Sequence, residues 1–76
     1  MKDLLTFLIK NITGSEDFTI NEIEEEGRII LNVEADANIV GLIIGKEGKT
    51  IKNLRKILSI RATKEQLGVN INVESR

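Results

Sequence analysis

The hydrophobic positions at the start of the chain recur every three to four residues, which is typical of one face of an amphipathic helix. The apolar residues with this spacing are Leu4, Leu5, Leu8, Ile9 and Ile12. They predict a helix over residues 4–11, and Asp3 stands where a capping side chain is expected. The glycine and small polar residues at positions 14–17 predict the loop that follows this helix.

Two stretches in the middle of the chain alternate between apolar and polar residues and therefore predict β-strands. Residues 18–24 place Phe18 and Ile20 on one face, whereas Ile23 breaks the alternation and indicates a bulge. The second stretch has four apolar residues at alternate positions, namely Ile29, Leu31, Val33 and Ala35. The turn between the stretches contains Gly27, which we expect to adopt a positive φ. The two strands should form an antiparallel hairpin.

A short helix is predicted over residues 39–44, with Asp36 or Asn38 placed to cap it. Gly41 lies inside this segment, although a glycine in a helix costs about 1 kcal/mol relative to alanine. We therefore expect another group to pack closely on Gly41.

A longer helix is predicted over residues 49–66. Its apolar face would consist of Ile51, Leu54, Leu58 and Ala62, and its opposite face of Lys49, Lys52 and Lys56. Gly68 stands where this helix is expected to stop, and alternation from Val69 to Val73 predicts a final strand. The order of the elements predicts an α+β fold in which three helices pack on one face of a three-stranded sheet.

The residue types that are absent exclude several kinds of chemistry. Without Cys there is no disulfide, thiolate nucleophile or cysteine-based zinc site. Without His the chain lacks the commonest metal ligand and the usual general base near neutral pH. We therefore expect no metal, no cofactor and no enzymatic activity. We also expect one domain over residues 1–76, no targeting segment, no membrane span and a cytoplasmic location.

The formal net charge of −1 conceals an uneven distribution of charge along the chain. Residues 1–36 contain three Lys or Arg and nine Asp or Glu, a net charge of −6, whereas residues 37–76 contain eight and three, a net charge of +5. This asymmetry indicates either an anionic partner for the second half or two halves whose charges mix in the folded molecule, and the charge count alone favours neither. The four glutamates between positions 22 and 26 are expected to form a solvated hairpin tip that repels an anion.

Two glycines separated by two residues, Gly45 and Gly48, lie between the two last predicted helices. They permit a tight turn and leave no side chain between the backbone and a ligand. The helix after Gly48 would direct its free N–H groups and the positive end of its dipole into this turn, which favours a phosphate there. Lys46 and Lys49 add positive charge beside it. The sequence therefore predicts a phosphate-binding helix–turn–helix.

This stretch resembles the signature of the KH family of RNA-binding domains, in which a G-x-x-G loop follows an apolar run and precedes a spaced Ile and Leu. The residues that carry the resemblance are Gly41, Ile43, Ile44, Gly45, Gly48, Ile51, Leu54 and Arg55. The extra helix and strand at the start resemble the prokaryotic type II arrangement of the family. The resemblance therefore covers essentially the whole chain and implies a type II KH fold, similar to small stand-alone bacterial members.

The resemblance also implies a mechanism and a set of site residues. A KH domain clamps about four nucleotides of single-stranded RNA or DNA, with the loop on the backbone and an aliphatic groove for the bases. The residues implied to bind RNA are Val40, Gly41, Ile43, Ile44, Gly45, Lys46, Glu47, Gly48, Lys49 and Lys52. Ile30 or Leu31 would complete the groove from the strand side. The implied role is that of an RNA chaperone or post-transcriptional regulator.

Glu47 departs from the pattern of the family, because many members carry a neutral or basic residue at this position of the loop. A carboxylate there repels phosphate, so we expect a modest affinity for RNA. The direction in which Glu47 points decides how large this effect is.

The end of the loop also resembles a nucleotide-binding P-loop, since Gly48, Lys49 and Thr50 match its last three residues. That motif needs another glycine five residues before Gly48, where Ile43 stands, and it needs a strand where this chain has a predicted helix. The sequence therefore does not support a nucleotide-hydrolysing function.

A protein-interaction module with minor RNA contact remains an alternative function of the same fold. Ile60 lies among lysines on the polar side of the third predicted helix, with Ile57 on its flank. It is either an ordinary exposed apolar residue or, together with Ile57, a site of self-association. The resemblance implies pairing with a second copy or with another KH-containing protein.

Overall fold

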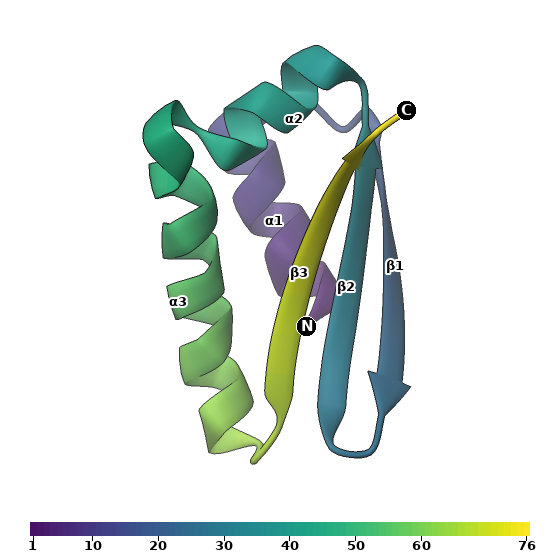
Figure 1. Cartoon of the computed structure of the whole chain (residues 1–76), viewed down its shortest axis with the longest axis vertical. Helices are drawn as coiled ribbons and strands as arrows, with labels where there is room; N and C mark the ends of the chain where they lie inside the picture. Colours follow the sequence, from purple (N-terminus) through teal and green to yellow (C-terminus); the bar gives the residue numbers. More distant parts are fainter.

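A computed structural model describes all of residues 1–76 and contains three α-helices and one three-stranded sheet (Figure 1). The elements are α1 (Lys2–Thr13), β1 (Phe18–Glu25), β2 (Arg28–Ala35), α2 (Ala37–Ile44), the 3₁₀ turn η1 (Lys46–Gly48), α3 (Lys49–Lys64) and β3 (Gly68–Ser75). The central strand β2 pairs antiparallel with β1 and parallel with β3. The predicted α+β class and the predicted order of elements are confirmed.

The core lies between the sheet and the layer of helices that covers one of its faces. β2 contributes every second residue to this core, in agreement with its alternating pattern: Ile29, Leu31, Val33 and Ala35. The predicted apolar face of α3 is also buried, through Ile51, Leu54, Leu58 and Ala62. All buried residues are apolar, and burial of one Leu or Ile side chain contributes about 1.5–3 kcal/mol.

The opposite face of the sheet is polar. Asn21, Asn32 and Asn72 lie in register on the three strands, and Asn72 Nδ2 donates a hydrogen bond to Asn32 Oδ1 at 3.0 Å. Ile30 lies on this face, where it pairs with Ile23 across the hairpin. The helices and the loop between α2 and α3 are therefore on the other side of the sheet from Ile30.

The β1–β2 hairpin has a regular register, so the predicted bulge is wrong. Every residue from Phe18 to Glu25 has one partner between Arg28 and Ala35, and Ile23 is exposed because it belongs to the outer face. The two turn residues, Glu26 and Gly27, both have a positive φ, of 41° and 77°. This conformation suits a two-residue hairpin, and it confirms the prediction for Gly27.

The ends of the helices differ from the sequence-based expectation. α1 begins after Met1 rather than Asp3, and Asp3 lies in the first turn, where its negative charge interacts favourably with the helix dipole. α3 ends at Lys64, before the expected stop at Gly68, and Gln66 adopts a left-handed φ of 58° in the turn that follows. None of the three helices has the length and apolar character needed to cross a membrane.

Candidate nucleic-acid interface

α2 and α3 are joined by a tight turn that is built around two glycines. The GxxG loop, residues 45–48, begins where the Gly45 N–H donates a hydrogen bond to the Gly41 carbonyl at 2.9 Å and closes α2. The Gly48 N–H then donates to the Gly45 carbonyl at 3.2 Å. The loop therefore reverses the chain within four residues and leads directly into α3.

Gly45 is required by both conformation and space. Its φ of 76° and ψ of 176° lie in a region that is essentially accessible to glycine alone. A Cβ atom at this position would lie 2.2 Å from Thr50 Oγ1 and 2.6 Å from Thr50 Cβ. The first turn of α3 thus packs directly on the backbone of Gly45.

Gly48 and Glu47 both adopt the left-handed helical conformation, with φ of 74° and 56°. A Cβ at Gly48 would find its nearest neighbour 3.9 Å away, so this glycine is required by conformation rather than by space. For Glu47, which has a Cβ, the left-handed conformation costs roughly 1–2 kcal/mol. Successive N–H groups in a turn of this kind form a concavity that binds anions.

The N-terminus of α3 opens into this loop. No side chain caps it, because the preceding residue is Gly48. The first N–H groups of a helix lack partners within the helix, and the dipole makes this end positive. The loop and the helix end together form a positive surface made of backbone groups.

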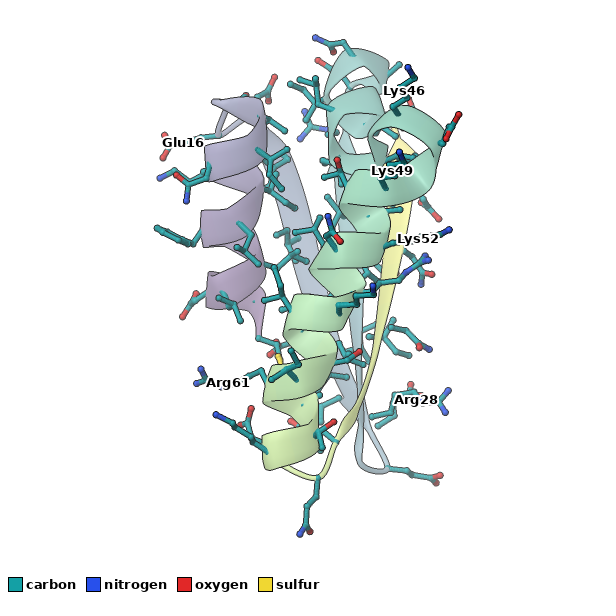
Figure 2. All side chains as sticks on the ribbon, turned by 90° about the vertical axis from the view of Figure 1, so that its left-hand side faces the viewer. Glu16, Arg28, Lys46, Lys49, Lys52 and Arg61 are labelled. Atoms are coloured by element: carbon teal, nitrogen blue, oxygen red, sulfur yellow. The ribbon has the colours of Figure 1, made fainter.

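Three lysines surround this surface without any acidic partner. Figure 2 shows Lys46, Lys49 and Lys52 one above the other along the loop and the first turns of α3. All three are exposed, and none takes part in an ion pair. Their positive charge is therefore available to an anionic ligand.

The carboxylate of Glu47 is exposed and forms no ion pair with the neighbouring lysines. The carboxyl group of Glu16, by contrast, forms an ion pair with Lys10. The hydrogen bond from Lys10 and its positive charge lower the pKa of Glu16. Figure 2 shows Glu16 near the end of α1, away from the GxxG loop. The loop therefore contains a free carboxylate beside free lysines.

α2 presents a small aliphatic surface beside the loop. Val40 is half-buried, and Ile44, four residues further, is 38% exposed. Gly41 lies between them on the helix surface, and nothing comes within 4 Å of the position its Cβ would occupy. The expectation that another group packs on Gly41 is therefore wrong, and the backbone of α2 is open here.

Two residues expected in the groove are buried. The side chain of Ile43 is fully buried in the core, and so is that of Leu31, so neither can contact a base. Ile43 follows Ile39 by four residues, so both face the sheet. Their apolar character in the sequence reflects packing rather than binding.

The strand that runs alongside α3, and so borders the candidate groove, is β3 rather than the expected β2. Figure 1 shows β3 as the strand nearest to α3, and its Val69 and Val73 are half-buried against the core. Neither residue expected on the strand side of the groove can therefore line it, because Ile30 lies on the outer face of the sheet and Leu31 is buried. The strand itself was predicted, but its place beside α3 was not, because strand order depends on a non-local pairing that the sequence pattern does not reveal.

The comparisons with known proteins agree over nearly the whole chain. The family model described as "KhpA/KhpB, KH domain" matches residues 2–73. Three proteins named RNA-binding protein KhpA are similar to the chain. The one from Chlamydia caviae is 35% identical over 96% of this chain and 95% of its own length, that from Thermotoga maritima is 37% identical over 78% and 80%, and that from Clostridium perfringens is 31% identical over 96% and 99%. No solved structure matches significantly.

Proposed function

This chain belongs to the KhpA/KhpB family of KH domains, and we propose that it binds single-stranded RNA with its GxxG loop. The observation that carries the proposal is the packing of Thr50 on Gly45, which leaves no room for a side chain and brings the start of α3 up to an open backbone loop. The proposal is supported by the start of α3, whose dipole favours an anion at the loop, and by the exposed lysines without acidic partners around it.

Exposure and charge indicate which residues would contact the RNA backbone and which would contact the bases. The GxxG loop would hold the sugar-phosphate backbone, and Lys46, Lys49 and Lys52 would neutralise its charge. The bases would lie on the aliphatic surface of α2, where Gly41 permits a close approach. Such a groove needs no aromatic side chain, unlike the stacking platforms of other RNA-binding folds.

The affinity is expected to be modest and to depend on salt. Three lysine–phosphate contacts with a single strand give a slope of about −2 in log K against log salt. Glu47 opposes binding through the negative charge that it adds to the loop sequence. We propose that the protein acts as a cytoplasmic RNA chaperone or post-transcriptional regulator.

Two matched double variants test the proposal without disturbing the backbone. Lys46→Gln with Lys49→Gln removes two charges at the loop, and Lys2→Gln with Lys64→Gln removes two exposed charges elsewhere. We expect the loop variant to lose most of its affinity for single-stranded RNA in fluorescence anisotropy, and the control to bind nearly as the wild type does. Equal affinities of the two variants would show that the loop is not the binding site.

A contact between copies is the second candidate function, favoured by exposed apolar residues on α3. Ile57 and Ile60 are 42% and 65% exposed, although both are large hydrophobic residues. We propose that they contribute to pairing with a second copy or with another KH-containing protein. This surface does not include the GxxG loop, so the two functions can be tested separately.

A further inference from the structure

The positive charge of the site continues along α3 beyond the loop. Arg55 and Lys56 follow Lys49 and Lys52 at spacings of three and four residues, so all four lie on one flank of the helix. Figure 2 shows Lys52 on the side of α3 that faces β3 and Arg61 on the side that faces α1. The flank formed by Lys49, Lys52, Arg55 and Lys56 is called the basic flank below.

The basic flank has no compensating negative charge. α3 contains no Asp or Glu, and none of the four residues forms an ion pair. Lys52 and Lys56 are four residues apart, a spacing at which like charges destabilise a helix. By contrast, Arg61 on the other flank is paired with Glu65 at 3.4 Å. On α3, four of the five cations that form no ion pair therefore lie on the flank that continues the loop, and the fifth is Lys64.

Resting on the RNA-binding function proposed above, we propose that Arg55 and Lys56 of the basic flank bind the sugar-phosphate backbone of the nucleotides next to those clamped by the loop. Lys52 and Lys56 are four residues apart, which corresponds to about 6 Å along a helix. At about 3.4 Å or more per nucleotide, this length accommodates roughly one or two additional phosphates. The preferred ligand is therefore a strand of about five or six nucleotides rather than four.

The basic flank also has a defined end. Beyond Lys56 the same side of α3 continues with Ser59, Ile60 and Thr63, which carry no charge. Figure 1 shows that this end of α3 lies at the same end of the molecule as the β1–β2 hairpin, whose tip contains Glu25 and Glu26. A longer strand would be repelled there, so the gain in affinity with length should stop.

Random-sequence RNAs of 4, 6, 8 and 12 nucleotides test this footprint by fluorescence anisotropy. For the wild type we expect affinity to rise from 4 to 8 nucleotides. From 8 to 12 nucleotides it should rise only because the longer RNA offers more overlapping positions at which the protein can bind. Arg55→Gln with Lys56→Gln should bind the 4-nucleotide RNA as the wild type does but lose the gain at 8 nucleotides. For the 8-nucleotide RNA, the slope of log K against log salt should become shallower by about 1.4.

A matched control comes from the other flank of the same helix. Arg61→Gln with Lys64→Gln removes the same two residue types and should keep the length dependence of the wild type. Equal behaviour of the two double variants, or equal affinity of the wild type for 4 and 8 nucleotides, would overturn the footprint. The proposed function of the loop would then still be tested separately, by the loss of affinity expected for Lys46→Gln with Lys49→Gln. Failure of the wild type to bind any of these RNAs would overturn both proposals.

Discussion

Glu47 has a backbone conformation that is unfavourable for folding and a charge that is unfavourable for binding a phosphate. Its φ of 56° is uncommon for a residue other than glycine, and its exposed carboxylate forms no ion pair with any lysine. Because one effect acts on folding and the other on binding, substitutions at this position separate them.

Replacement of Glu47 by lysine should tighten RNA binding at low salt. The change removes a repulsive charge and adds an attractive one, so the slope of log K against log salt should become steeper by about 0.7 if one phosphate contact is gained. Glu47→Gly is the control for the backbone, since glycine relieves the left-handed strain without adding a positive charge. Unchanged affinity of the lysine variant would show that the side chain points away from the RNA.

The two glycines of the loop should differ in their tolerance of a methyl group. Gly45→Ala introduces both backbone strain and a clash with Thr50, so we expect a loss of about 2–4 kcal/mol in the free energy of unfolding. Gly48→Ala has space for the methyl group and should lose only about 1–2 kcal/mol. Chemical denaturation of both variants measures the difference, and equal losses would contradict the packing of Thr50 on Gly45.

At the scale of elements, strong periodicity made the sequence informative. The alternation in β2 and the apolar face of α3 were predicted residue by residue, because both elements bury one complete face. The ends of helices were predicted less well, because tertiary structure decides them. Gly68, for example, begins β3, and its N–H donates to the Gly27 carbonyl of the hairpin. No pattern within the α3 sequence contains that information.

The candidate site was predicted only in part, for a related reason. The prediction for the loop glycines and lysines rests on local sequence, and the structure places them together in one loop and the start of α3. Ile43 and Leu31, by contrast, were assigned to a groove although they are buried. An apolar residue in a helix or strand can face either the core or a ligand, and only the packing of the layers distinguishes these cases. The position of β3 beside α3 was likewise beyond the reach of a pattern in the sequence.

Ile60 provides the prediction that belongs to the surface of α3. Ile60→Lys should leave the free energy of unfolding nearly unchanged, since this side chain is 65% exposed, and should reduce self-association measured by analytical ultracentrifugation. Phe7→Lys is a suitable control, because Phe7 is equally exposed but lies on α1. A wild-type chain that is already monomeric at high concentration would show that Ile57 and Ile60 do not hold two copies together.

At the scale of the whole molecule, the basic loop and the acidic hairpin tip lie at opposite ends, although each end carries charges of both signs. The GxxG loop and the β1–β2 hairpin tip are separated along the longest dimension, which extends over 33 Å (Figure 1). Figure 2 shows Glu16 at the end of the molecule that holds Lys46, and Arg28 and Arg61 toward the other end. The field that acts on an approaching polyanion is therefore local to the loop and to the tip.

Neutralising the hairpin tip should change how fast RNA associates. We expect Glu24→Gln with Glu25→Gln and Glu26→Gln to raise the association rate constant at low salt, because repulsion at that end is removed, and to leave the dissociation rate constant unchanged. Stopped-flow fluorescence measures both constants. The difference should vanish near 0.15 M salt, where the screening length is about 8 Å. A change in dissociation instead would mean that the tip touches the RNA.

The parallel pairing of β3 with β2 has a consequence for protein synthesis. Each residue of β3 pairs with a residue 40 positions earlier, from Arg28 with Gly68 to Ala35 with Ser75. Such distant pairings form late in folding, since the intervening chain must first become compact. The strand that flanks the candidate site is also synthesised after the GxxG loop and α3. A nascent chain should therefore be unable to hold RNA until β3 has emerged from the ribosome and paired with β2.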